Sequence, residues 1–237
     1  MLLERQVMIK LIAFDADDTL WENENFFFEV HEQYAEFMTK YVPKEEMLQH
    51  LHETEMRNLQ PLGYGIKAFT ISLMEAALSI TNNKIDPEDL SHILQMGKGM
   101  IERPVHLLDG VTEVLEKLQG RYKLITITKG DLLDQNRKLR KAGLADYFTD
   151  FIVVNEKDES TYTGILEKYR VDPKHFFMVG NSMKSDVIPA LEIGAHAAHI
   201  PFRYTWQHEL AEHNGRYENL YELKHMCELL NIDLLKG

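Results

Sequence analysis

The chain has 237 residues, of which 44% are hydrophobic and 27% charged, so it can bury one large core or a core with an insertion. Its net charge of −12 argues against a nucleic-acid-binding surface. No window approaches the roughly 18 consecutive apolar residues of a membrane span, and residues 1–7 lack the long apolar stretch of a signal peptide. The single cysteine, Cys227, excludes an intramolecular disulfide. We therefore expect a cytoplasmic protein without nucleic-acid or membrane partners.

The first predicted strand is the apolar run that ends at Phe14, directly before Asp15 and Asp17. Such a run, bounded by turn residues, is typical of a buried strand in a parallel sheet. Ligands bind at the carboxyl ends of strands in open α/β sheets. Two acids so close together can divide nucleophilic attack and proton transfer between them. An Asp-rich turn can also simply cap the next helix, so this pair alone does not define a function.

The next segment, from about Asn23 to Arg103, is predicted to be entirely helical. Apolar and aromatic residues recur at three- and four-residue steps from Phe27 to Tyr41, which predicts a helix that Pro43 ends. Three more helices are predicted over 44–58, 66–80 and 87–101, the last with Asp86 as N-cap. The pattern indicates a small helical bundle inserted behind the first strand.

Beyond Pro104, strands and helices alternate regularly. Strands are predicted over 122–127, 151–154, 176–179 and 197–200, and helices over 111–118, 131–142, 159–169 and 184–193. This alternation favours a doubly wound parallel sheet. We therefore predict an α/β core formed by residues 1–21 and 104–237, and a helical subdomain formed by residues 22–103.

Three further polar segments follow predicted strands. Thr128-Lys129-Gly130 precedes a helix, where a hydroxyl and backbone N–H groups can bind an anion. Lys157 follows the next strand, and the segment from Gly180 to Asp186, which includes Asn181, follows the one after that. Each has an ordinary interpretation as a helix cap or a solvated surface residue. Their order along the chain is more informative than any one of them.

In that order, the four segments resemble the signatures of the haloacid dehalogenase superfamily, whose members are mostly phosphatases. The resemblance implies a Rossmann-like core, and the helical block is similar to the family's cap. It also implies that Asp15 is the nucleophile and that Asp17 is the general acid and base. Thr128 with the Lys129 and Gly130 amides would donate hydrogen bonds to phosphoryl oxygens, and Lys157 would be the cation that neutralises their charge.

The resemblance further implies a Mg²⁺ ion held by Asp15, the backbone carbonyl of Asp17, and the fourth segment through Asn181 and Asp186. The chain departs from the family pattern at Asn181, which stands where an acidic residue is usual. We expect weaker metal binding for this reason, with Asp186 holding Asn181 or a metal-bound water. Lys157 is also followed by Asp158 rather than by the proline often found there.

These observations predict a Mg²⁺-dependent phosphatase that cleaves a small phosphorylated metabolite through an aspartyl-phosphate. Asp17 favours a phosphatase over a dehalogenase, because a halide leaves without a proton. The alternatives are a phosphomutase, a phosphonatase or a dehalogenase of the same superfamily, or a catalytically weak protein that binds phosphorylated ligands. His196 and His199 lie on opposite faces of a short strand and are predicted to be ordinary core-edge or surface residues. We expect a monomer or homodimer, and no motif in 202–237 indicates a role.

Overall fold

The computed structural model describes residues 8–204, 206 and 217–236. The chain forms two compact units, which we call the sheet unit (1–22, 105–128 and 139–237) and the helical unit (23–104 and 129–138). The amino-terminal residues 1–7, for which we predict no signal peptide, lie outside the described residues.

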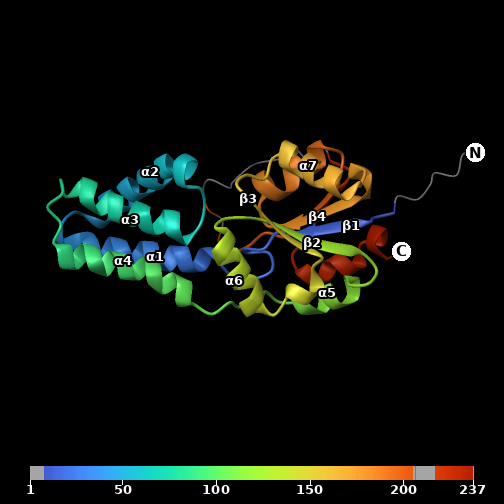
Figure 1. Ribbon diagram of the computed structural model, residues 1–237, viewed down its shortest axis with the longest axis horizontal. Coiled ribbons are helices and arrows are strands. Elements are labelled where there is room, and N and C mark those ends of the chain that lie inside the picture. The colour runs from blue at the N-terminus through green and yellow to red at the C-terminus, as the bar shows by residue number, and fades with distance from the viewer. Residues whose placement is uncertain (1–7, 205, 207–216, 237) are drawn as a thin grey trace, which may run out of the picture. The chain divides into compact units, whose positions relative to one another are not determined.

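The sheet unit contains a six-stranded sheet with strand order β3-β2-β1-β4-β5-β6 (Figure 1). Strand β1 pairs in parallel with β2 and β4, β4 with β5, and β5 with β6. The strands are β1 (Leu11–Phe14), β2 (Lys123–Lys129), β3 (Asp150–Val154), β4 (Phe176–Gly180), β5 (His196–His199) and β6 (Leu220–Glu222). The predicted parallel α/β sheet is thus confirmed. Strand β6 was not predicted, since three residues are too few to show a strand pattern.

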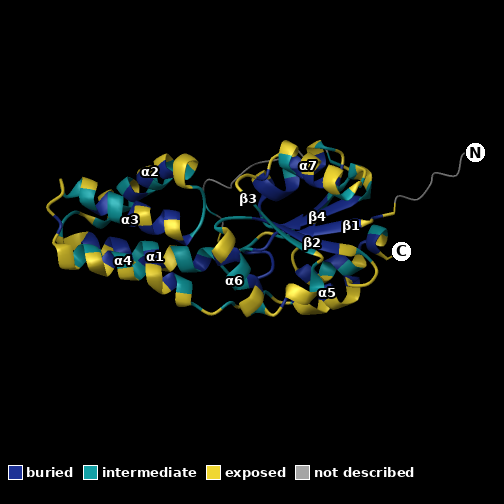
Figure 2. Ribbon diagram, viewed as in Figure 1, coloured by how far each residue is buried: buried dark blue, intermediate teal, exposed yellow. Residues whose placement is uncertain are grey.

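Alternate side chains of the central strands enter two different hydrophobic cores. Ile12 and Phe14 of β1 pack on one face with α5 (Val111–Leu118) and the 3-10 turn Met226–Asn231. Leu11 and Ala13 pack on the other face with α7 (Glu159–Tyr169) and α8 (Ile188–Glu192). Figure 1 shows α5 and α7 on opposite sides of the sheet, and Figure 2 shows β1 and β4 between them as buried. Burial on both faces explains why the strands are continuous apolar runs.

The helical unit contains four helices packed around one hydrophobic core, together with residues 129–138. The helices are α1 (Glu24–Phe37), α2 (Lys44–Leu62), α3 (Ile66–Ile80) and α4 (Pro87–Glu102), and residues 132–138 begin α6 (Leu132–Ala142). Tyr34 is fully buried in this core, where its hydroxyl donates to the carbonyl oxygen of Leu73 (2.9 Å). Asp86 caps α4 as predicted, accepting from the Glu88 amide (2.8 Å).

The first helix of this unit ends earlier than predicted. Helix α1 stops at Phe37 and continues only as the 3-10 turn Met38–Lys40, well before Pro43. Pro43 instead precedes α2 as its N-cap, with extended backbone angles (φ −57°, ψ 145°). The residue before a proline is also disfavoured in the helical conformation, so the chain leaves the helix before Pro43 rather than at it.

Among the helices in the described parts of the chain, none is both long and apolar enough to cross a bilayer.

Close packing of α3 on α4 predicts opposite outcomes for two glycines of α4. A Cβ atom on the buried Gly97 would overlap the Thr70 side chain, whereas one on the exposed Gly99 would meet no atom within 4 Å. Gly97→Ala should therefore lower the free energy of unfolding by about 1–3 kcal/mol through overpacking. Gly99→Ala should raise it by up to about 1 kcal/mol, because alanine favours a helix. Urea unfolding of both variants tests this; equal effects would contradict the packing described.

Candidate active site

The Asp15–Trp21 segment forms a tight turn at the carboxyl end of β1. The Asp15 amide donates to the carbonyl oxygen of Val179 on β4 (2.8 Å), and the Leu20 amide donates to that of Ala16 (2.8 Å). Asp18 has a left-handed backbone with φ 62°, a conformation that aspartate tolerates better than most residues. The turn places both predicted catalytic carboxylates at the edge of the sheet where ligands bind in this class of fold.

A buried lysine joins the first segment to the fourth. The Lys157 ammonium donates to Oδ1 of Asp15 and to Oδ1 of Asp186 (2.6 Å). The exposed fractions of Asp15, Lys157 and Asp186 are only 6%, 5% and 1%. One cation thus lies between two carboxylates, and the buried trio carries a net charge of −1 when all three groups are ionised. The structure therefore brings together three of the residues that the sequence singled out.

This environment shifts the ionisation of the trio. Burial raises the pKa of Asp15 to about 7, and the negative charge of Asp186 adds to this effect although Lys157 opposes it. For Lys157, burial lowers the pKa, but the two carboxylates outweigh it and hold that pKa above its ordinary value. Lys157 therefore stays a cation at neutral pH, while Asp15 depends on further positive charge to be fully ionised.

Lys157 owes its position to a short loop between β3 and α7. Asp158, which stands where the family often has proline, is the N-cap of α7 and accepts from the Thr161 amide (2.8 Å). N-capping satisfies an N–H group that has no partner within the helix, so this aspartate anchors the helix start directly after Lys157. The departure from the family pattern at Asp158 therefore has a structural explanation.

Asp186 reaches the site through a π turn. The sequence predicts one α-helix over 184–193, but the structure has a π turn at Met183–Val187 followed by α8. Each turn of a π helix contains more residues than an α turn, and such turns are frequent at functional sites. Oδ2 of Asp186 accepts from the Ser182 amide (2.9 Å). A Cβ atom at Gly180 would overlap the Asp186 carboxylate, which explains the glycine.

The Asn181 side chain faces the Asp15 turn. With its amide nitrogen turned inward, it donates to the Asp17 carbonyl oxygen (3.2 Å), to Oδ2 of Asp15 (3.2 Å) and to Oγ1 of Thr19 (3.1 Å). Rotation of the amide by half a turn would present its oxygen at the same place. The Asn181 oxygen would then lie 3.2 Å from the Asp17 carbonyl oxygen and 3.2 Å from Oδ2 of Asp15, and oxygen is the ligand type that Mg²⁺ prefers. The residues present thus fit a magnesium ion.

Within the described residues, no group of three or more His, Cys, Asp or Glu side chains is arranged to hold a metal. Two of the expected donors are of another kind, since Asp17 would use its backbone carbonyl and Asn181 an amide. Asp186 accepts from the Lys157 ammonium and from the Ser182 amide. These contacts suit a residue that orients the side chains which would bind the metal.

The second segment is divided between the two units. Thr128 is buried at the end of β2, and the pairing of Phe14 with Thr126 puts it level with Ala16, beside the Asp15 turn. Lys129 and Gly130 belong to the helical unit. There the Lys129 ammonium lies 4.1 Å from the centre of the Tyr64 ring, and Nε2 of Gln135 donates to the Lys129 carbonyl oxygen (2.8 Å). Anion binding by this segment stays a prediction.

Three residues that were not predicted as site residues contact the predicted ones. Thr19 donates to Oδ2 of Asp15 (3.1 Å), Nε1 of Trp21 donates to Oδ1 of Asp17 (2.7 Å), and Nε2 of His199 donates to the Asn181 carbonyl oxygen (3.0 Å). Thr19 and Trp21 lie in or directly after the segment that contains Asp15 and Asp17. Their closeness in sequence to these two residues could have identified them as site residues. His199 is the half-buried last residue of β5, in keeping with the prediction of an edge residue, and the pairing of β5 with β4 brings it beside Asn181.

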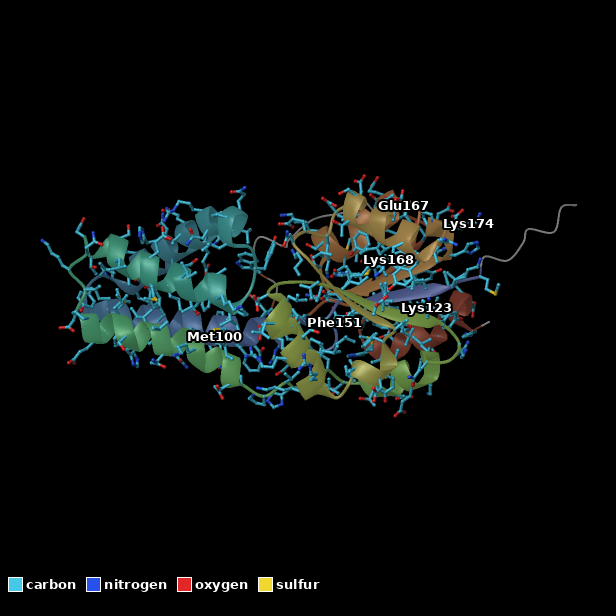
Figure 3. All side chains as sticks on the ribbon, in the orientation of Figure 1. Met100, Lys123, Phe151, Glu167, Lys168 and Lys174 are labelled. Carbon is cyan, nitrogen blue, oxygen red and sulfur yellow. The ribbon has the colours of Figure 1, made fainter. Side chains whose placement is uncertain are left out.

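The buried trio predicts a large stability effect for Lys157→Met. The substitution leaves Asp15 and Asp186 buried without their cation and should lower the free energy of unfolding by about 3–5 kcal/mol at pH 8. Lys174→Met is a matched control, because Lys174 lies on the surface of the sheet unit (Figure 3), in an exposed ion pair with Asp172. Urea midpoints measured without added metal test this. A Lys157→Met midpoint equal to that of the control would contradict the buried pairing.

Comparison with known proteins gives a consistent family. The sequence profile of the haloacid dehalogenase-like hydrolases matches residues 9–194. The crystal structure of a haloacid dehalogenase-like family hydrolase from Xanthomonas campestris is similar over 95% of this chain and 90% of that one, with 33% identity and a TM-score of 0.83. No curated protein sequence matches the chain.

More distant structures share the fold but have different activities in their descriptions. A predicted phosphoglycolate phosphatase from Haemophilus somnus has 16% identity and a TM-score of 0.64, with 94% of this chain and 97% of that one covered. A 2-haloacid dehalogenase from Pseudomonas syringae pv. tomato has 21% identity and the same TM-score, with 97% and 99% covered. The fold is therefore compatible with either reaction, and the site residues must distinguish them.

Proposed function

Because the chain belongs to the haloacid dehalogenase-like hydrolases, we propose that it is a Mg²⁺-dependent phosphatase that hydrolyses a small phosphate monoester. The observation that carries the proposal is the second carboxylate, Asp17, beside the buried nucleophile candidate Asp15. Asp17 is half-buried while the other residues from Leu11 to Trp21 are buried, so it is the most exposed residue of this segment. An alkoxide leaving group needs a proton donor and a halide does not, which favours phosphate ester cleavage.

The proposed reaction has two steps. A carboxylate oxygen of Asp15 attacks phosphorus, and the bond between phosphorus and the ester oxygen breaks as Asp17 gives that oxygen a proton. Asp17 then takes a proton from water as the water oxygen attacks the phosphorus of the aspartyl-phosphate. The bond between phosphorus and Asp15 breaks, which releases inorganic phosphate and restores the Asp15 carboxylate, while Asp17 is again protonated.

The residues around Asp15 and Asp17 would neutralise negative charge and hold the phosphoryl group in position. Lys157 offsets the repulsion between the Asp15 carboxylate and the phosphate anion, and Thr128 with the Lys129 and Gly130 amides would bind phosphoryl oxygens. A Mg²⁺ ion would be held by Asp15, the Asp17 carbonyl and Asn181, with Asp186 orienting the site. It would supply additional positive charge to the phosphoryl group. Such charge also favours the ionised form of Asp15.

The helical unit would serve as the cap of this enzyme. Its helices α1–α4 are inserted in the chain between β1 and β2, directly after the turn that carries Asp15 and Asp17. We propose that this unit admits substrates by opening and selects among them, as lids do in many enzymes. The substrate class is a small phosphorylated metabolite of the cytoplasm.

Hydrolysis of p-nitrophenyl phosphate tests the proposed function. Wild-type turnover should require Mg²⁺ and should be abolished in Asp15→Asn, which replaces the nucleophile by a near isostere. Chloride release from 2-chloropropionate, measured in parallel, should be absent. Turnover retained by Asp15→Asn would remove the mechanism. Chloride release without phosphate release would instead assign the chain to the dehalogenases.

Asn181→Asp should tighten Mg²⁺ binding, because it adds a negative charge next to Asp15 and the Asp17 carbonyl. The same charge should lower the thermal stability of the metal-free protein, since a third carboxylate then shares one ammonium group. Calorimetric titration and thermal unfolding measure the two effects. Gln95→Glu, which adds the same charge on an exposed position of α4, should change neither. An unchanged Mg²⁺ affinity in Asn181→Asp would show that this position does not contact the metal.

A further inference from the structure

The indole of Trp21 forms a hydrogen bond that the reaction itself does not require. Its Nε1 donates to Oδ1 of Asp17 over 2.7 Å, while the ring is completely buried in the core of the sheet unit. A buried tryptophan usually finds a partner for its N–H, and a backbone carbonyl would serve that purpose equally well. Here the partner is the side chain proposed to transfer the proton.

The backbone around Trp21 holds the indole firmly in place. The Asp18 amide donates to the Trp21 carbonyl oxygen (2.7 Å), the Glu22 amide donates to that of His106 (3.0 Å), and the Leu108 amide donates to that of Leu20 (3.0 Å). Trp21 also forms β-bridges with Asp17 and Leu107. The hydrogen bond therefore ties a half-buried carboxylate at the site to a rigid, fully buried ring.

The chemistry of indole restricts where the proton of Asp17 can lie. Indole N–H is a donor and never an acceptor, and the carbonyl oxygen of a protonated carboxyl accepts a hydrogen bond better than its hydroxyl oxygen does. The contact with Trp21 therefore favours Oδ1 as the unprotonated oxygen of the Asp17 carboxyl. The proton that moves to and from the leaving group is then carried by Oδ2.

We propose that Trp21 is a positioning residue that orients the Asp17 carboxyl and assigns its mobile proton to Oδ2. The proposal rests on the proposed phosphatase function, because Trp21 acts through Asp17 in its role as general acid. Loss of the indole N–H should impair proton donation selectively. The fall in kcat should be largest for substrates whose leaving group depends most on protonation.

Trp21→Phe tests this, because it keeps an aromatic ring in the core and removes the donor. On phenyl phosphate, whose leaving group needs protonation, kcat should fall by about tenfold or more, the effect of one hydrogen bond to a charged group. On p-nitrophenyl phosphate, a better leaving group, kcat should fall much less, and KM should stay the same for both. Tyr34→Phe is the matched control, because it also removes a buried aromatic donor but lies in the helical unit. It should show no dependence on the leaving group.

Two further results decide between positioning and simple packing. In an Asp17→Asn background, Trp21→Phe should cause no additional loss, because the residue through which it acts is already disabled. Equal losses on both esters, or a further loss in that background, would overturn the proposal and leave Trp21 a packing residue.

An NMR measurement separates this proposal from the phosphatase proposal. The chain has two tryptophans, so ¹⁵N-indole labelling gives two signals, and Trp21→Phe identifies the one from Trp21. Asp17→Asn should move the Trp21 signal and leave that of Trp206 in place. An unmoved Trp21 signal would overturn the contact itself. A wild-type chain that hydrolyses neither ester would overturn the phosphatase function and the positioning role, even if the signal moves.

Discussion

The ion pair between Lys157 and its two carboxylates is the interaction on which the site depends. A buried charge is tolerated only when it is paired, and Lys157, Asp15 and Asp186 come from three loops far apart in the sequence. The strand order β3-β2-β1-β4 places the segment after β4 next to the one after β1, and the loop after β3, which carries Lys157, two strands from β1. Local structure then fixes these segments: Asp158 caps the helix that follows Lys157, and the π turn directs Asp186 inward.

Charge balance in this cluster gives a physical reason for the asparagine at position 181. The two buried carboxylates share one ammonium group, so a third acid would add repulsion in the metal-free protein. An amide can donate to Asp15 and to the Asp17 carbonyl, and it can present an oxygen to a cation after rotation. Asn181 therefore lowers the attraction for the proposed Mg²⁺ ion and also lowers the charge repulsion in the metal-free site.

The choice between reactions depends on very few atoms. Structures described as a phosphatase and as a dehalogenase share this fold at equal TM-scores, so the arrangement of strands and helices does not separate them. Asp17 favours the proposed phosphatase reaction, because a general acid is needed for an ester oxygen and not for a halide. Its link to the buried indole of Trp21 gives this side chain a defined orientation at the sheet edge.

The sequence by itself determined the parallel α/β fold, the inserted helices and the order of the four polar segments, because periodicity and turn residues are local properties. Helices α3 and α7 have the predicted bounds. Only the tertiary structure decided that Lys157 bridges Asp15 and Asp186, that 183–187 form a π turn, and that Trp21 and His199 contact site residues. These features depend on which strands become neighbours and on how buried charges find partners, and residue spacing along the chain encodes neither.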